Sequence, residues 1–209
     1  MTKMLRFAVA APLALALAAC GSNDDAATTV QGEPVAAVPA PAGTEWRDTV
    51  TVTPQGGYLM GNPEAPIKLV EYGSLTCPAC AAFANDGAEK LKNDYVNSGR
   101  VSFEFRSMLI HGTMDLVLTR MISCGSPEAV HPLSDQVWAN LQEILTPAQT
   151  NAAALDQALQ LPEDQRFVAF AQQAGLFDFF ASRGVSTDQA KQCLADFPAL
   201  EKMAETLQK

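Results

Sequence analysis

Histidine, positive charge and long apolar runs are all scarce in this chain. Only two of its 209 residues are histidine, and 14 lysines and arginines stand against 23 aspartates and glutamates. The formal net charge of −9 would repel a phosphate backbone, which argues against nucleic-acid binding. His111 and His131 stand alone, at no metal-ligand spacing from the cysteines, so both are predicted to be structural. His111 is also a candidate for lining a site, because it follows a predicted strand.

The first twenty residues have the layout of an export signal. Lys3 and Arg6 form a basic start, and residues 7–16 form an apolar segment that is too short to span a bilayer. The Leu-Ala-Ala-Cys run that ends at Cys20 resembles the lipobox of bacterial lipoproteins, which implies cleavage before Cys20 and lipid attachment to its sulfur. The alternative is an ordinary cleaved signal peptide followed by an incidental cysteine.

A composition change marks where folding should begin. Residues 1–19 are predicted to be a lipoprotein signal peptide, and residues 20–45 a flexible tether, because the tether is rich in Ala, Pro, Thr, Gly and acidic residues without apolar periodicity. A folded domain is predicted over residues 46–209. If the chain comes from a bacterium with two membranes, Gly21 after Cys20 favours sorting to the outer membrane over the inner one.

The cysteine count fits an oxidising compartment. Five cysteines less Cys20 leave four, which is an even number, as disulfide pairing requires. Cys124 and Cys193 fall on apolar helix faces and are predicted to form a structural disulfide. Two unpaired buried thiols are the alternative.

A strand, a helix and a second strand are predicted in the first part of the domain. Residues 67–72 form a short apolar run suited to a strand covered on both faces, and residues 101–105 alternate as a half-buried strand does. Between them, apolar and small residues recur at helical spacing, namely Cys80, Ala84, Gly87, Leu91 and Tyr95, and Gly99 supplies a stop. A right-handed parallel crossover is the expected geometry. Residues 49–53 are predicted to form an edge strand.

From about residue 113 the pattern is wholly helical. Ser186 and Thr146 each begin a capping-box pattern and predict helix starts. Apolar residues recur at helical spacing and predict three buried stripes. These stripes are Met114, Val117, Met121 and Cys124; Val130, Leu133, Val137, Leu141 and Leu145; and Phe167, Phe170, Phe177 and Phe180.

The run Cys77-Pro78-Ala79-Cys80 carries the strongest chemical signal. It lies between the predicted strand and the predicted helix, and Pro78 suits a first helical turn. A cysteine at a helix start is exposed to free N–H groups and to the positive end of the helix dipole, which favour its thiolate. Cys80 would lie one turn further on the same face, close enough for a disulfide. The pair is predicted to exchange its disulfide with another protein.

Glu71 lies six residues before Cys77, in the predicted strand beneath the motif. A carboxylate buried near Cys80 would have a raised pKa and could take the Cys80 proton through water. The alternative is a surface glutamate on a strand edge.

The residues from Glu71 to Cys80, followed by a helix, a Phe-rich strand and a helical insertion, resemble the DsbA-like branch of the thioredoxin superfamily. The likeness covers residues 46–209 and is strongest over 58–106. It implies an α/β thioredoxin-like fold, with a βαβ half over residues 46–108 and a helical insertion over residues 109–209. It also implies that Cys77 is the nucleophile, Cys80 the resolving cysteine and Glu71 the buried acid.

Three neighbours, Thr76, Pro78 and Ala79, form the environment of the redox motif. Family members commonly carry histidine where this chain has Ala79, and that histidine can stabilise the thiolate. Its absence should make the disulfide less oxidising.

A second departure concerns the end of the sequence. Family members close the fold with a cis-proline loop, a β-hairpin and a last helix, which this sequence does not contain before Lys209. The C-terminal ββα part is therefore expected to be missing, through truncation or decay of a family member. The strand at residues 67–72 would then keep one unpaired edge.

These observations predict a protein-disulfide oxidoreductase that faces the periplasm of a bacterial cell envelope as a lipoprotein. Its expected partners are exported proteins with cysteine pairs, a membrane or thioredoxin-like protein that recharges it, and the membrane itself through Cys20. No cofactor and no metal are expected. The alternatives are an extracytoplasmic copper carrier that uses the same two thiolates, or an inactive truncated protein. The sequence has no Met or His cluster beside Cys77, which argues against the carrier.

Overall fold

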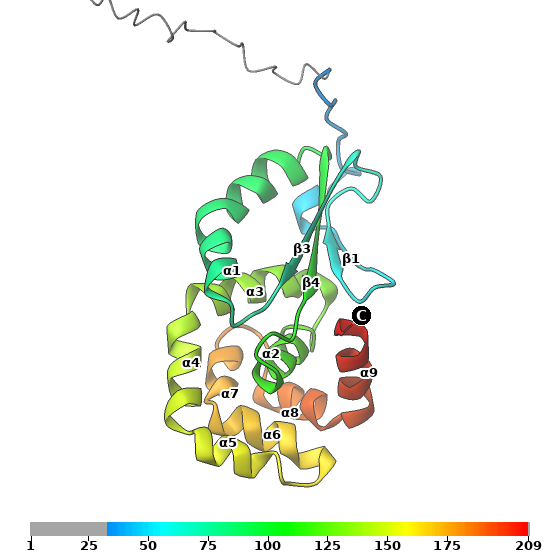
Figure 1. Ribbon diagram of the computed structural model, residues 1–209. Coiled ribbons are helices and arrows are strands. Elements are labelled where there is room, and N and C mark those ends of the chain that lie inside the picture. The colour runs from blue at the N-terminus through cyan, green and yellow to red at the C-terminus, as the bar shows by residue number, and fades with distance from the viewer. Residues whose placement is uncertain (1–32, 209) are drawn as a thin grey trace, which may run out of the picture. The chain divides into compact units, whose positions relative to one another are not determined.

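Four strands form one mixed sheet in the computed structural model, which describes residues 33–208. The strand order is β1-β2-β4-β3. Strands β1 and β2 form an antiparallel hairpin, β2 pairs antiparallel with β4, and β4 pairs parallel with β3 (Figure 1). The parallel crossover predicted between the last two strands is confirmed. The strand bounds are β1 Val50–Val52, β2 Tyr58–Met60, β3 Ile67–Gly73 and β4 Val101–Ser107.

A single helical stretch carries the chain from β3 back to β4. It comprises α1 (Pro78–Phe83) and two π-helical segments, η2 (Ala84–Ala88) and η3 (Leu91–Val96). Each π turn adds a residue and rotates the later side chains around the axis. Val96 is therefore fully buried, while Tyr95, which the regular spacing had placed on the apolar stripe, is 44% exposed.

Gly99 ends this stretch, as predicted. Its φ of +74° lies in the left-handed region, which favours glycine, and its N–H donates to the Val96 carbonyl over 2.8 Å. A Cβ at this position would also collide with the Val38 carbonyl oxygen. The site thus requires glycine for both conformation and space.

Burial of the two long strands is the reverse of the prediction. Strand β4 was expected to be half-buried but is buried on both faces, because it is central and its polar side is covered. Glu104 accepts from Arg106 and from Thr53 Oγ1, both over 2.7 Å. Strand β3 was expected to be covered on both faces but lies at the edge of the sheet, with one side unpaired among residues 33–208.

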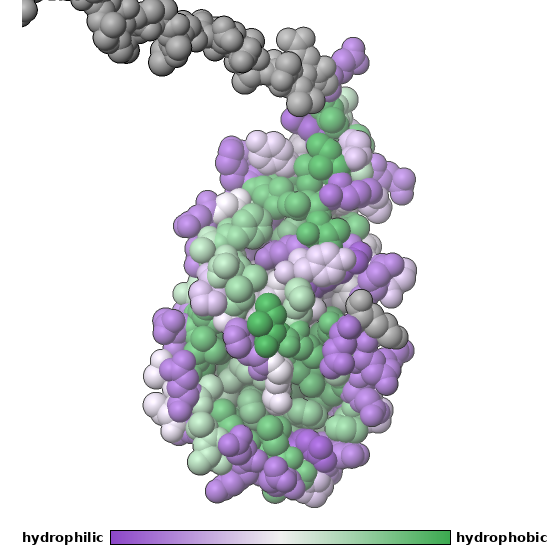
Figure 2. Space-filling model, in the orientation of Figure 1, coloured by the Kyte–Doolittle hydropathy of each residue, from purple (hydrophilic) through white to green (hydrophobic). Residues whose placement is uncertain are grey.

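The apolar side chains of β3 are consequently exposed. Tyr72 is 60% exposed and Ile67 47%, and Leu69 and Val70 are also exposed. Figure 2 shows hydrophobic surface on the face over which β3 runs in Figure 1.

Helices alone follow β4 in the described chain, and they enclose the main hydrophobic core. The three predicted stripes are confirmed as core positions, with Cys124 and Leu145 packed at its margin. Ser186 caps its helix by accepting from the Gln189 N–H, as predicted, whereas Thr146 lies inside α4 and begins no helix. The helices are α2 Thr113–Ile122, α3 Val130–Ala139, α4 Leu141–Thr150, α5 Ala152–Ala158, α6 Glu163–Gln173, α7 Leu176–Ala181, α8 Thr187–Ala195 and α9 Phe197–Leu207, with short 3₁₀ turns η1 Trp46–Asp48 and η4 Pro127–Ala129.

Cys124, just after α2, and Cys193, in α8, form a disulfide with their Cα atoms 5.9 Å apart. The bond closes a loop between positions 69 residues apart and ties the two ends of the helical region together.

Replacing Cys124 and Cys193 together by alanine should lower the free energy of unfolding by about 4 kcal/mol. Without the disulfide, the unfolded chain is no longer constrained by a bond between positions 69 residues apart. Urea denaturation under oxidising conditions measures this loss. A Cys20→Ala variant, which keeps the bond, serves as the control. A loss below about 1 kcal/mol would contradict a stabilising role.

Residues before Trp46 contact the folded domain. The Val38 N–H donates to the Ser98 carbonyl, and Trp46 Nε1 donates to the Val38 carbonyl. Cys20, the signal peptide and residues 20–32 of the predicted tether lie outside the described residues. No helix within residues 33–208 is long and apolar enough to cross a membrane.

Candidate active site

Cys77 occupies the N-cap of α1, at the end of the loop that leaves β3. Its backbone is extended, with φ −87° and ψ 122°, and Pro78 opens the helix as predicted. The Cys77 N–H donates to the Ser74 carbonyl over 3.2 Å, and its own carbonyl accepts from the Ala81 N–H over 3.1 Å. Cys77 is therefore held at the point where the helix N–H groups are unsatisfied.

The two thiols have opposite acidities. The pKa of Cys77 is lowered, chiefly because the backbone N–H of Cys80 donates to its sulfur, with further help from the Cys80 thiol and the Ala79 backbone. Burial is the main reason why the pKa of Cys80 is raised to about 11, and the nearby charges of Cys77 and Glu71 contribute to this rise. Cys77 is therefore the thiol that loses its proton first, while Cys80 stays protonated near neutral pH.

The flanking residues divide into buried and exposed positions. Thr76 is only 4% exposed, whereas Pro78 and Ala79 are exposed beside Cys77. Ala79 stabilises the thiolate only through its backbone, since its side chain has no donor.

Glu71 is partly buried, although its neighbours Val70 and Tyr72 in β3 are exposed. Burial raises the pKa of Glu71 to about 7, against the opposing charge of Lys92 and with a small contribution from Asp135. Its charge in turn acts on Cys80. The structure thus brings together Cys77, Cys80 and a carboxyl group that titrates near neutral pH.

Sequence reasoning missed the ion pair beside Glu71. Lys92 from η3 pairs with Asp135 from α3, and the Lys92 side chain is only 13% exposed. Burial raises the pKa of Asp135. No spacing in the sequence signals this pair, because its members are brought together only by the packing of α3 against the crossover helix.

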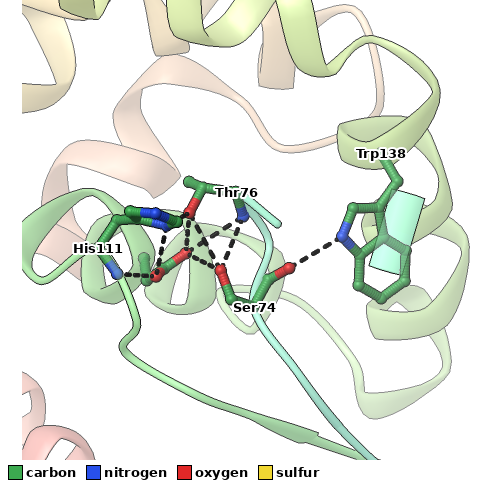
Figure 3. A network of polar contacts seen from close by, with 5 residues as sticks. Ser74, Thr76, His111 and Trp138 are labelled. Carbon is green, nitrogen blue, oxygen red and sulfur yellow. Dashed lines mark hydrogen bonds and ion pairs between the residues drawn. The ribbon is translucent and has the colours of Figure 1, made fainter. Parts of the chain in front are cut away.

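The residues before Cys77 belong to a second, buried polar network (Figure 3). Asp115 in α2 is fully buried and accepts hydrogen bonds from Ser74 Oγ and Thr76 Oγ1, both over 2.8 Å. Thr76 Oγ1 also lies 2.7 Å from His111 Nδ1. Trp138 Nε1 donates to the Ser74 carbonyl over 3.1 Å.

The two histidines differ in position. His111 reaches the redox loop through Thr76 while its own side chain stays 57% exposed. His131 is buried against Phe103, with Nε2 2.9 Å from the Tyr58 carbonyl oxygen, and burial lowers its pKa to about 4. Its role is structural.

A groove of about 570 Å³ begins at the redox loop. Thr76, Pro78 and His111 line it beside the redox loop, and α4 and α5 contribute apolar residues. Its other residues include Leu145, Ala148, Ala152, Leu155, Leu159 and Phe170.

Within residues 33–208, no group of three or more His, Cys, Asp or Glu side chains is arranged to hold a metal ion.

Comparison with known proteins places this geometry in a family. A family model described as Thioredoxin matches residues 53–206. The disulfide bond formation protein D of Bacillus subtilis (strain 168) is 30% identical over 84 residues, which are 40% of this chain and 36% of that protein. The chain thus matches about a third of the length of that relative.

Two solved structures extend the likeness. A protein-disulfide isomerase from Novosphingobium aromaticivorans has a TM-score of 0.65 and 26% identity, covering 73% of this chain and 78% of that one. The α-DsbA1 protein of Wolbachia pipientis shares the fold, with a TM-score of 0.51, 21% identity, and coverage of 72% and 65%. From its family match, its sheet with a helical insertion and its Cys-Pro-Ala-Cys helix start, the chain belongs to the thioredoxin family and has DsbA-like proteins among its structural neighbours.

Proposed function

We propose that this protein is a thiol–disulfide oxidoreductase that exchanges a Cys77–Cys80 disulfide with cysteine pairs of exported proteins. The observation that carries the proposal is the opposed acidity of the two thiols at the start of α1. A thiolate that is stable and accessible is both a good nucleophile and a good leaving group. The named activities of the relatives support the same chemistry.

In the oxidising direction, a substrate thiolate attacks the Cys77 sulfur of the disulfide. The Cys77–Cys80 bond breaks, its electron pair leaves on Cys80, and Cys80 takes up a proton because its pKa is about 11. The second substrate thiolate then attacks the substrate sulfur of the mixed disulfide. Cys77 leaves as a thiolate, and the substrate has lost two electrons to the protein.

Glu71 would exchange a proton with Cys80 during these reaction steps. Its pKa of about 7 allows it to give a proton in one direction and to accept one in the other near neutral pH. Resolution in the reducing direction needs this help most, because Cys80 must lose a proton before it can attack Cys77.

The protein would act in the bacterial cell envelope. The export signal over residues 1–19 and the lipobox-like run at Cys20 support a lipoprotein that faces the periplasm, with the outer membrane as its site of attachment. Its partners would be unfolded exported proteins and a membrane or thioredoxin-like protein that restores its redox state. No dissociable cofactor is required for thiol exchange.

The groove beside Cys77 would hold the substrate segment next to the reacting cysteine. Thr76 and Pro78 flank Cys77 and also line the groove, so a bound chain would pass directly from the apolar walls to the sulfur. An unfolded segment with an apolar side chain near its cysteine fits these walls.

Replacing Ala152 by glutamate places a charge on the groove wall and should raise KM severalfold for a cysteine peptide with apolar neighbours, leaving kcat nearly unchanged. Ala153→Glu is the matched control, since Ala153 is also exposed on α5 but does not line the groove. Steady-state kinetics with both variants measure the difference. Equal KM values would rule out this substrate path.

The proposed activity itself is tested with the full chain in two assays, reduction of insulin and oxidation of reduced RNase. Turnover in either assay that requires Cys77 supports the proposal. Failure in both, by a protein whose Cys77–Cys80 disulfide forms and is reduced normally, would overturn it.

A further inference from the structure

Asp115 is a fully buried carboxylate whose hydrogen-bond partners lie next to the redox pair in the chain. Its Oδ1 accepts from Ser74 Oγ and Thr76 Oγ1 and, over 3.2 Å, from the Thr76 N–H. Its Oδ2 accepts from the His111 N–H over 2.7 Å. Four donors therefore surround one buried negative charge, and two of the three residues that supply them, Ser74 and Thr76, lie within three residues of Cys77.

The loop held by Asp115 contacts both sulfur-bearing residues. The Ser74 carbonyl accepts from the Cys77 N–H and from Trp138 Nε1, which fixes the turn into α1. The Ser74 backbone also forms a hydrogen bond that lowers the pKa of Cys80, against the larger effect of burial. A shift of this loop would therefore alter the surroundings of both thiols.

The same network reaches His111. Thr76 Oγ1 donates to Asp115 Oδ1 and also lies 2.7 Å from His111 Nδ1, so Thr76 links the imidazole to the buried carboxylate. His111 thus points its Nδ1 edge toward Thr76 in the loop, and it also lines the groove.

We propose that Asp115 is a positioning residue that holds the loop before Cys77 through Ser74 and Thr76 and whose buried charge favours the disulfide form of the Cys77–Cys80 pair. This inference deepens the proposed function and rests on it.

The sign follows from electrostatics. The N–H of Cys80 dominates and lowers the pKa of Cys77, while the charge of Asp115 acts in the opposite direction. A negative charge held near Cys77 disfavours its thiolate, and the thiolate exists only in the reduced form. Asp115 therefore makes the disulfide a weaker oxidant than it would be without that charge.

Equilibration with glutathione tests the inference. Two glutathione thiols give two electrons to the Cys77–Cys80 disulfide, which yields the dithiol and one glutathione disulfide. Asp115→Asn removes the charge and should shift this equilibrium toward the dithiol by roughly threefold to tenfold, because the Cys77 thiolate of the reduced form is then less disfavoured. Asp178→Asn, at an exposed aspartate of α7, is the matched control and should leave the equilibrium constant unchanged.

A purely structural role predicts a different result. It would destabilise the oxidised and reduced forms equally and leave the glutathione equilibrium where it was. An unchanged equilibrium, or a shift toward the disulfide, overturns the proposal.

If Asp115→Asn does not fold, Ser74→Ala decides the question. It removes one donor from the carboxylate and leaves more of its charge unmatched, so the equilibrium should move the other way, toward the disulfide. No movement would overturn the proposal. Because the equilibrium is measured on the protein's own thiols, it does not depend on the insulin and RNase assays that test the proposed activity.

Discussion

Replacing Cys80 by serine is expected to trap the protein on its substrate as a stable mixed disulfide. In this variant the reduced Cys77 still attacks a substrate disulfide, because its thiolate is stabilised by backbone N–H groups of α1 that the substitution keeps. No thiol then remains to resolve the bond. Close to one substrate molecule per chain should accumulate, and turnover should stop.

Cys77→Ser is the matched control for this experiment. It keeps Cys80, whose pKa of about 11 leaves almost no thiolate near neutral pH, so neither adduct nor turnover above the uncatalysed exchange is expected. Non-reducing electrophoresis and mass spectrometry of both variants with a disulfide substrate measure the adduct. Trapping through Cys80 rather than Cys77 would reverse the assigned roles.

Replacing Glu71 by glutamine should slow the resolving step by about 100-fold, the range expected when a general base is lost. Glutamine keeps the size of the side chain but cannot accept the Cys80 proton. The slow step should appear as a longer-lived mixed disulfide in single-turnover kinetics, while the first attack by Cys77 keeps its rate. Glu64→Gln, at an exposed glutamate just before β3, is the control.

The same substitution should stabilise the fold at high pH. The folded-state pKa of Glu71, about 7, lies above its ordinary value of 4.5, so the folded protein holds the proton more tightly than the unfolded chain does. Below about pH 4.5 Glu71 is protonated in both the folded and the unfolded state, so no charge is buried on folding. As the pH rises, the free-energy cost of burying the charged carboxylate grows, and it reaches its full value above about pH 7.

Glu71→Gln removes that cost and should raise the free energy of unfolding by about 1–2 kcal/mol at pH 8, a value reduced for the partial solvent access of the group. Near pH 4.5 the gain should vanish. Urea denaturation at the two pH values measures it. Equal stability of wild type and variant at pH 8, together with unchanged resolution kinetics, would show that Glu71 is an ordinary surface glutamate.

Local chemistry allowed the redox motif to be predicted from the sequence. Pro78 after Cys77 indicates a helix start. The place of Cys77 at this start determines that its sulfur, rather than that of Cys80, lies beside the free N–H groups. The helical stripes were predictable for a similar reason, since their period depends only on neighbouring turns.

What the sequence did not reveal depends on contacts between distant segments. Asp115 lies 41 residues from Ser74 and 39 from Thr76, and no spacing rule connects them. The burial of β3 and β4 was reversed because strand order, rather than strand composition, decides which strand is central. The π-helical segments have a similar effect. A regular helical period predicts that Tyr95 is buried, but the added residues place Val96 in the core instead.

The rate of alkylation of each thiol as a function of pH tests the account most directly. The reduced protein is treated with iodoacetamide, and modification at each cysteine is followed by peptide mass spectrometry. Cys77 should react first, with an apparent pKa clearly below the value of about 8.5 for a free thiol, while Cys80 stays protected through neutral pH. A Cys77 that titrates at or above that value, or a Cys80 that is modified first, would contradict the account.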